Sequence, residues 1–521
     1  MEDIGYCNQL IYMIKVKNVA KYSLMISLIL VLSKLIGTVR EIVIASQYGA
    51  TDIADIFKVS TNIPNIFYLV IASALSVSFI PVFADIKNDK EKANRFFNNI
   101  LNIIIIICII CTLIGIVFSM PIVQKMAGGK SPEILMEMSN YTKIVMPTVI
   151  FLAISGLYTG YLQSYGIFLQ PALTGIVSSL VIIIAVVIFS DYGVGVAVIA
   201  FFLSAVAQVV MQRPFMKGYK YKFVLDFKDE HVRKMIRLAI PILIATAASQ
   251  INVFVATNYA SRFAEGSIAI VDYATKISTL INQAFIVSIT TVFYPIMTER
   301  FADNKLDDFK DTFKKATNII SIVVLPMAVG LFILADPVIA LVFQSDKFDA
   351  YAVSRTSSYL KVLVFSTIGF SFIDIFSKAF YAMKNTFIPM INGLLQMILN
   401  VIFIVVLTPI FKYNGLGIAT TLTVIIVGGV TLIQLKYKIK DLPVKEIVTT
   451  NIKGVISSII MGIGVYYTYI LIGNRFASIT RITSFIKIII PAIVGVIIYA
   501  IMLKVLKVKE FEDVINSRSL K

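Results

Sequence analysis

The chain has 521 residues, of which 58% are hydrophobic and only 15% are charged, against about 25% charged residues in ordinary soluble domains. So little polar sequence cannot cover the cores of a soluble protein of this length, and it also excludes disordered and coiled-coil proteins. Unbroken apolar runs of about 18 to 26 residues fit helices that cross a bilayer, whereas a transmembrane barrel would show short alternating strands. The sequence therefore predicts an all-α polytopic membrane protein.

The net charge of +17 is distributed over short loops between the apolar runs, which indicates a topology signal rather than a nucleic-acid surface. The three cysteines and the single histidine provide neither a disulfide framework nor a metal-ligand set, and we expect no cofactor. Cys108 and Cys111 form a CxxC pair inside the apolar run Ile103–Val117. We interpret this pair as apolar filler of a membrane helix; a redox or zinc site is the alternative.

Fourteen membrane-spanning helices are expected from the apolar runs. Their approximate limits are 23–46, 60–84, 97–119, 141–163, 168–190, 194–212, 236–260, 270–298, 316–340, 358–382, 387–410, 415–436, 447–472 and 484–506. The run at 141–163 is the weakest because it contains Lys143 and Pro147. Residues 1–22 combine charges with a short apolar stretch, so we expect a cytoplasmic N-terminal segment rather than a cleavable signal peptide.

An even number of spans places both termini on the same side of the membrane. Lysine and arginine are roughly threefold more frequent in the loops of one side than in those of the other, and basic loops stay in the cytoplasm. The basic set includes the loop 213–235 and the tail 507–521. We therefore expect both termini to be cytoplasmic.

The two halves of the sequence resemble each other. Matching pairs include Tyr141 with Tyr359, Lys143 with Lys361, Pro171 with Pro389 and Gly175 with Gly393, all at an offset of 218, and Gly195 with Gly417 at 222. Each copy contains six spans, an even number, so the copies should have the same orientation, as in parallel-repeat transporters. We expect two six-helix lobes, 23–212 and 236–436, in a parallel pseudo-twofold repeat, followed by two extra C-terminal helices within 447–506.

Several ionisable residues lie inside the expected spans, where each charge costs at least about 2.5–3.5 kcal/mol. The first span contains Ser33, Lys34, Arg40 and Glu41, and Asp55 lies near the start of the second. Counted from the end of the span at 1.5 Å per residue, Lys34 would lie about 18 Å deep, which snorkelling explains poorly. The first span is therefore a candidate ligand site.

Two later spans contain an aspartate followed by a lysine four residues on, namely Asp272 with Lys276 and Asp374 with Lys378. Residues at this spacing are neighbours on one helix face. We expect Asp374 and Lys378 to pair with each other.

The cations of the first span have no counterpart in the second half, where Lys34 aligns with about Gln250 and Arg40 with about Ala256. A purely structural role should occur in both halves, so a cluster in one half indicates an anionic ligand. Arginine and lysine both suit phosphate. Internal ion pairing, for instance of Arg40 with Asp55, is the alternative.

These residues resemble the MurJ/MviN family of lipid II flippases, whose superfamily also contains polysaccharide exporters and multidrug extruders. The similar stretches are 33–41, 48–50, Asp55, 63–65, 79–83, 266–268, 273–276, 293–295 and 379–386 with Pro389. The resemblance implies a transporter with fourteen spans, rather than an enzyme, in the bacterial cytoplasmic membrane.

Carried over position by position, the resemblance implies a substrate-binding set. It consists of Ser33, Lys34, Arg40, Glu41, Asp55 and Lys276. The chain departs from the family where Tyr68 and Leu69 replace an Arg-Arg pair, and where Lys34 and Lys276 replace arginines. Ala256 and Ile404 stand about where some members have sodium-binding carboxylates, so the sequence does not indicate a coupling ion.

The leading hypothesis is a flippase that moves lipid II, an undecaprenyl-pyrophosphate-linked peptidoglycan precursor, from the inner to the outer leaflet for cell-wall synthesis and cell shape. A flippase for another undecaprenyl-linked oligosaccharide, of a capsule or exopolysaccharide, is the main alternative. A cation-coupled drug exporter would require cavity carboxylates, and a membrane-embedded glycosyltransferase would require a large external loop. The expected partners are the lipid-linked substrate and the bilayer, with no nucleic acid.

Overall fold

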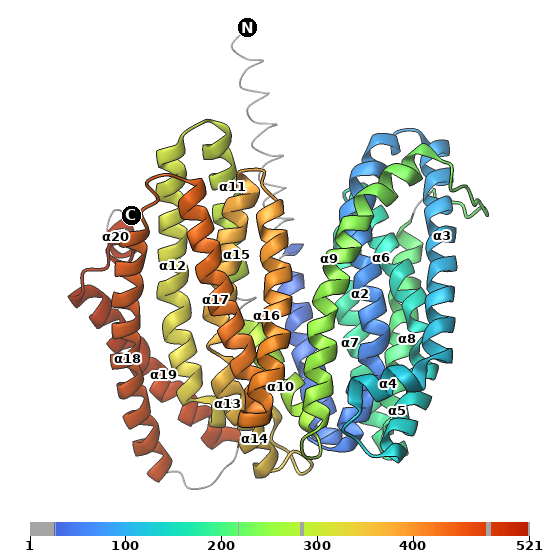
Figure 1. Cartoon of the computed structure of the whole chain (residues 1–521). Coiled ribbons are helices and arrows are strands. Elements are labelled where there is room, and N and C mark those ends of the chain that lie inside the picture. Colours follow the sequence, from blue (N-terminus) through green and yellow to red (C-terminus); the bar gives the residue numbers. More distant parts are fainter. Residues whose placement is uncertain (1–24, 27, 217, 282–285, 476–480, 519–521) are drawn as a thin grey trace, which may run out of the picture. The chain divides into compact units, whose positions relative to one another are not determined.

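The computed structural model describes residues 25–26, 28–216, 218–281, 286–475 and 481–518. All regular secondary structure in these ranges is helical, which confirms the predicted all-α fold. The expected N-terminal segment 1–22 and the last residues of the expected tail, 519–521, lie outside the described residues. The chain divides into two compact units (Figure 1).

The first unit contains, among the described residues, 25–48, 52–125 and 130–247. Its helices are the first helix (28–48), α2 (Asp52–Ile86), α3 (Lys90–Val117), α4 (Ser119–Ala127), α5 (Pro132–Val145), α6 (Thr148–Ser164), α7 (Leu169–Phe189), α8 (Gly195–Gln212) and the first part of α9 (Glu230–Ser261). α2 packs against α5 and α6, and α7 packs against α8. α9 begins at Glu230, inside the segment 213–235 that we expected to be a loop.

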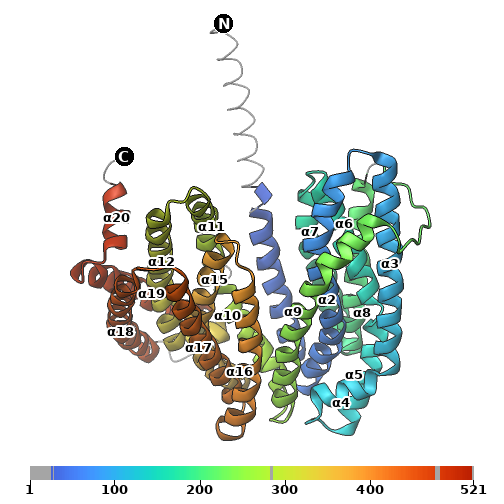
Figure 2. The same cartoon turned by 45° about the horizontal axis from the view of Figure 1, so that its top comes forward.

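The second unit contains the described residues from Ala248 onward together with the short segments Gly49–Thr51 and Met126–Gly129. Its helices are α10 (Ser267–Ile281), α11 (Val287–Ala302), α12 (Leu306–Ile333), α13 (Ala335–Phe343), α14 (Ala350–Leu363), α15 (Ser366–Ala382), α16 (Phe387–Phe411), α17 (Asn414–Lys438), α18 (Val444–Arg475), α19 (Arg481–Val505) and α20 (Lys509–Arg518). α18 packs on α12, and α19 packs on α18 and α13 (Figure 2).

Eleven helices in the described ranges are long and apolar enough to cross a membrane, or twelve if the bent pair α5 and α6 is one span. Each of the twelve corresponds to one of the expected spans. The two remaining expected spans, 23–46 and 270–298, both include residues outside the described ranges. The polytopic membrane fold is therefore confirmed, while the count of fourteen stays a prediction.

The expected helix at 141–163 is two helices, α5 and α6, bent by 42°. The bend follows from Pro147, which has no N–H to donate and whose ring clashes with the preceding turn. Two shorter bonds span the break, from Val149 N to Met146 O and from Ile150 N to Pro147 O, both 3.1 Å. The junction of α14 and α15 has the same bond pattern, from Thr367 N to Val364 O and from Ile368 N to Phe365 O, but these two helices together form one 33-residue span, Ala350–Ala382.

The helix boundaries follow the sequence repeat. α3 and α12 both have 28 residues and begin at Lys90 and Leu306, an offset of 216. α4 and α13 both have nine residues at the same offset. The pairs α5 with α14 and α6 with α15 have equal lengths, and their limits differ by 218 throughout. The duplicated motifs therefore occur on duplicated helices.

Close helix packing in the second unit depends on a glycine of α15. A Cβ atom on Gly369 would lie 2.5 Å from Cγ2 of Val424 and 2.9 Å from the backbone nitrogen of Ile425. The backbones of α15 and α17 can approach this closely only without a side chain at Gly369. By contrast, a Cβ atom on Gly429, which lies on α17 as Val424 and Ile425 do, would have no neighbouring atom within 4 Å.

Gly369→Ala should therefore destabilise the protein by about 1–3 kcal/mol, the usual range for overpacking. Gly429→Ala is the control and should be neutral or slightly stabilising, because alanine is the better helix former. The thermal stability of fluorescent-protein fusions in one detergent, followed by size-exclusion chromatography, measures both. Equal behaviour of the two variants would contradict the tight approach at Gly369.

Candidate functional site

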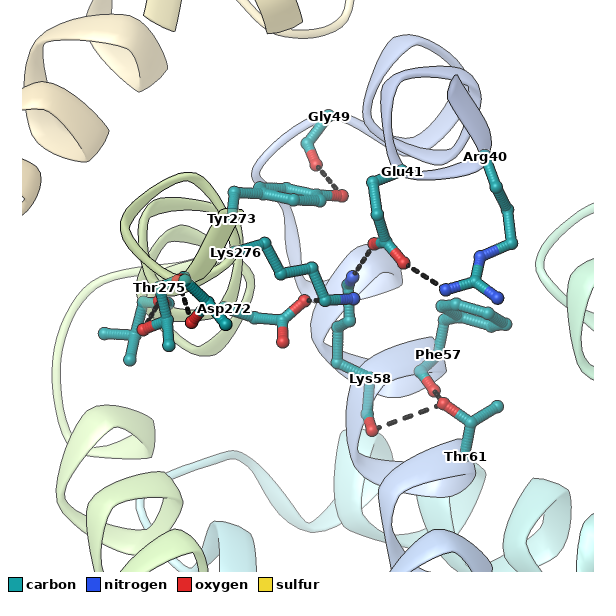
Figure 3. A network of polar contacts seen from close by, with 12 residues as sticks. Arg40, Glu41, Gly49, Phe57, Lys58, Thr61, Asp272, Tyr273, Thr275 and Lys276 are labelled. Carbon is teal, nitrogen blue, oxygen red and sulfur yellow. Dashed lines mark hydrogen bonds and ion pairs between the residues drawn. The ribbon is translucent and has the colours of Figure 1, made fainter. Parts of the chain in front are cut away.

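A carboxylate in the first helix holds two cations of the first unit. Glu41 accepts a hydrogen bond at 2.8 Å from Nη2 of Arg40, its neighbour in the chain, and one at 2.6 Å from Nζ of Lys58 on α2 (Figure 3). The side chains of Glu41 and Lys58 are only 7% and 9% exposed, whereas that of Arg40 is 27% exposed. The three formal charges sum to +1, and the most accessible of them is the guanidinium.

The ion pair with Glu41 fixes the position of Arg40 and leaves part of its guanidinium available to a ligand. A guanidinium has five N–H donors in a planar fork, and the ion pair with Glu41 uses the Nη2 end. The partly exposed remainder can donate to an oxyanion. The cations Arg40 and Lys58 offset the cost of burying the carboxylate of Glu41.

Lys34 lies six residues before Arg40, about 9 Å away along the helix axis. Its side chain is exposed, and it forms no ion pair with any residue that the structure describes. Ser33 is half-buried, and its Oγ lies 2.4 Å from the Cβ position of Gly175 on α7, so an alanine there would collide with it. The first helix therefore presents one uncompensated cation and a hydroxyl beside α7.

Asp55 has a different environment from the other predicted site residues. It is fully buried, and its carboxylate lies 2.6 Å from Nζ of Lys130, which also contacts Asp52 at 2.5 Å. Both aspartates belong to the first turn of α2, where negative charge is favoured by the helix dipole. The lysine side chain is only 5% exposed. This triad ties the start of α2 to the segment that leads into α5.

Burial by itself would lower the pKa of Lys130, but the attraction of Asp55 and Asp52 outweighs it and raises the pKa. A lysine whose pKa is higher in the folded than in the unfolded state stabilises the fold below its unfolded value. This stabilisation is therefore complete at neutral pH. It is lost only as the pH rises above 10.5, the ordinary lysine value, and through the raised pKa.

Lys276 lies on α10 in the second unit and pairs with Asp272 at 3.2 Å, one turn away. Both side chains are about one-third exposed. The expected pair of Asp374 and Lys378 is confirmed at 3.0 Å, and Lys378 also donates to Thr290. Lys276 thus belongs to a local pair of the same type.

Two partners in these clusters were missed by the sequence reasoning. Lys58 contacts Glu41 and Lys130 contacts Asp55 across 17 and 75 positions, so no local spacing indicates them. The alternative pairing of Arg40 with Asp55 is wrong, because Arg40 pairs with Glu41 instead. For Lys58 the only signal was its place between Phe57 and Val59 in an apolar run, and for Lys130 the sequence offered none.

Most of the chain matches one known protein family. A family model described as "Lipid II flippase MurJ" matches residues 44–484. The chain belongs to the MurJ family. A relative from Buchnera aphidicola subsp. Acyrthosiphon pisum, named "Probable lipid II flippase MurJ", is 29% identical over 78% of this chain and 81% of its own length. A relative from Haemophilus influenzae with the same name is 28% identical over 75% of this chain and 81% of its own length.

Solved structures resemble the fold. A structure titled "Lipid II flippase MurJ, inward closed conformation" has a TM-score of 0.79 at 22% identity and covers 93% of this chain and 99% of that one. An inward-facing multidrug transporter of the MOP superfamily has a TM-score of 0.70 at 16% identity, and the match covers 79% of this chain and 95% of that one. The architecture is therefore that of MurJ and its MOP superfamily neighbours.

Removal of the amine in Lys130→Ala should lower the free energy of unfolding by about 3–5 kcal/mol, because the carboxylate of Asp55 would be left buried without this cation. Lys130→Ala combined with Asp55→Asn should recover much of the loss. Lys90→Ala, at the exposed start of α3, is the control. Thermal stability at neutral pH in one detergent measures all three. A single variant as stable as the control would contradict a stabilising role of the triad.

Proposed function

We propose that this chain is a flippase that translocates lipid II from the inner to the outer leaflet by alternating access, for cell-wall synthesis. The match of the MurJ family model to residues 44–484 is the observation that carries the proposal. It is supported by relatives that are named as lipid II flippases. The cationic first helix fits the same substrate, since lipid II carries its negative charge on a pyrophosphate.

Lys34 and Arg40 are the proposed contacts to the pyrophosphate. Lys34 is exposed without an ion partner among the described residues, and Arg40 retains free donors while Glu41 fixes it. Charge-assisted hydrogen bonds from arginine to phosphate are among the strongest in proteins. Ser33, beside Lys34, is a further proposed donor to the same group.

The other site residues have supporting roles in this proposal. Glu41 positions the guanidinium of Arg40, with Lys58 on its second oxygen. Asp55 is too buried to contact a ligand directly and fixes the start of α2 through Lys130. Lys276, about one-third exposed, is a proposed substrate contact of the second unit.

A flippase for another undecaprenyl-linked oligosaccharide is the second candidate. Its support is the departure from the family pattern at Tyr68 and Leu69 and the lysines at positions 34 and 276. Both candidates use the same pyrophosphate chemistry. Replacement of a depleted lipid II flippase by this chain would separate them, because an exporter of another saccharide would not restore growth.

The protein is proposed to lie in the bacterial cytoplasmic membrane with both termini in the cytoplasm. In this topology Tyr437 is cytoplasmic and Tyr192 is external. These residues suit labelling because they are 86% and 83% exposed.

In a variant without native cysteines, Tyr192→Cys should react with a membrane-impermeant maleimide added to intact cells. Tyr437→Cys should react only after the membrane is permeabilised. The expectation follows from the basic residues that surround Tyr437 at the end of α17. The opposite labelling pattern would show that Tyr192 is cytoplasmic and Tyr437 external, and would contradict the proposed topology.

Arg40→Ala should abolish rescue of a flippase-depleted strain while the protein still inserts. The variant loses the proposed hydrogen bond from the guanidinium of Arg40 to the pyrophosphate, and such a bond between charged groups contributes about 1.5–3 kcal/mol to binding. Arg40→Lys should be milder, because charge is retained and the planar fork is lost. Lys143→Ala is the control, since this α5 lysine is exposed and has only a 3.5 Å contact to Asn140.

A triple variant separates ligand contact from ion pairing. If Arg40 only neutralises the group that it forms with Glu41 and Lys58, then Arg40→Ala together with Glu41→Gln and Lys58→Met should regain function, because all three charges are removed at once. We expect this triple variant to stay inactive although it still inserts. Growth of the depleted strain on it would refute the ligand role of Arg40.

A further inference from the structure

Three asparagines of α3 hold the chain that connects α8 to α9. Asn98, Asn99 and Asn102 are 2%, 1% and 3% exposed. Their amide nitrogens donate to the backbone oxygens of Lys220 (3.0 Å), Asp226 (2.8 Å) and Val224 (2.9 Å). Their amide oxygens accept from Tyr219 Oη (2.7 Å), the backbone nitrogen of Asp226 (2.8 Å) and Tyr221 Oη (3.0 Å). Residues 219–227, here called the linker strap, are thus fastened along α3.

Side chains at both ends of the linker strap add to this attachment. The ring of Tyr219 meets that of Phe97 edge-on at 4.9 Å, and the guanidinium of Arg213 lies 5.0 Å from the centre of the Tyr219 ring. Near the other end, Arg95 of α3 and Asp226 form an ion pair at 3.5 Å. The strap, drawn in green beside α3 in Figure 1, therefore has a fixed face toward the helix and a fixed face away from it.

Part of the linker strap is apolar and exposed. Phe223, Leu225 and Phe227 occupy every second position and are 67%, 42% and 55% exposed, whereas Val224 between the first two is half-buried. Tyr221 does not belong to this apolar face, because its hydroxyl donates to Asn102 of α3. Three neighbouring large apolar side chains that are exposed together mark an interaction surface rather than scattered surface residues.

The attachment to α3 sets the level of this apolar face relative to the membrane. Asn102 is followed at once by the uncharged run Ile103–Val117, whereas the charges of α3, from Lys90 to Arg95, all precede the asparagines. Because Val224 is bonded to Asn102, the middle of the strap lies where α3 enters the hydrocarbon. Its neighbours Phe223 and Leu225 share this level.

Three lysines accompany the apolar face. Lys220, Lys222 and Lys228 are exposed, and none forms an ion pair with a residue that the structure describes. Aromatic and aliphatic side chains interleaved with lysines are typical of segments that lie in the membrane interface, where the apolar groups enter the acyl boundary and the amines reach lipid phosphates.

We propose that the linker strap is a membrane-interface anchor: its apolar face enters the leaflet that it borders, and its lysines bind anionic phospholipid headgroups there. The bilayer is the occupant that the observations favour, because the spans α3 and α8 place lipid at this level on the same unit. A protein partner would not account for the match between the exposed apolar face and the start of the uncharged run.

The chain contains no tryptophan, so single tryptophan variants report on one position without background. Full-length Phe223→Trp and its neighbour Lys222→Trp are reconstituted in nanodiscs of phosphatidylcholine brominated near the top of the acyl chain. Phe223→Trp should have blue-shifted emission, lose most of it to the brominated lipid and resist aqueous acrylamide. Lys222→Trp, which replaces an exposed lysine outside the apolar face, should be quenched mainly by acrylamide. Leu225→Trp should behave as Phe223→Trp does.

Two results would overturn the anchor. Equal acrylamide quenching of Phe223→Trp and Lys222→Trp would place the apolar face in water. Protection of Phe223→Trp from both quenchers would mean that protein covers it. The lysines are tested by added phosphatidylglycerol, which should increase the blue shift of Phe223→Trp. This increase should be lost when Lys220, Lys222 and Lys228 are all changed to glutamine; an increase that persists would refute headgroup binding by these lysines.

Discussion

A charged side chain inside the hydrocarbon has no bulk water to solvate it, so a partner or a hydrated cavity must compensate its charge. This requirement organises the polar residues of both units. In the first unit Glu41 is buried between Arg40 and Lys58. In the second unit Asp272 and Asp374 each have a lysine one helical turn later. The helices can be apolar along nearly their whole length because the few charges on them are arranged in local groups.

The first helix departs from this balance. Lys34 is exposed and forms no ion pair with any described residue, and the guanidinium of Arg40 stays partly exposed beside Glu41. Its aligned positions in the second half are uncharged. Duplication alone would give both copies the same charges, so cations at these positions in only one copy distinguish the two copies. These cations fit the pyrophosphate of the proposed substrate.

Much of the fold could be predicted from the sequence, because hydrocarbon thickness sets the length of apolar runs. Twelve of the expected spans correspond to apolar helices of the described ranges, and the helix limits repeat at offsets of 216 and 218. The pair Asp374–Lys378 was also predictable, since its geometry is local. The partners of Glu41 and Asp55 were not, because Lys58 and Lys130 meet them only through tertiary packing. The resemblance to a family indicated Asp55, but its complete burial required the structure.

Bonds of the same pattern join α5 to α6 and α14 to α15, although Phe365 stands in the second copy where the first has Pro147. The geometry differs: α5 and α6 are bent by 42°, whereas α14 and α15 together form one span of 33 residues. The sharp bend thus belongs to the copy with the proline. Phe365 retains the N–H that a continuous helix needs, and Pro147 lacks it. A single residue therefore decides whether this part of the duplicated fold crosses the membrane as one rod or as two segments at an angle.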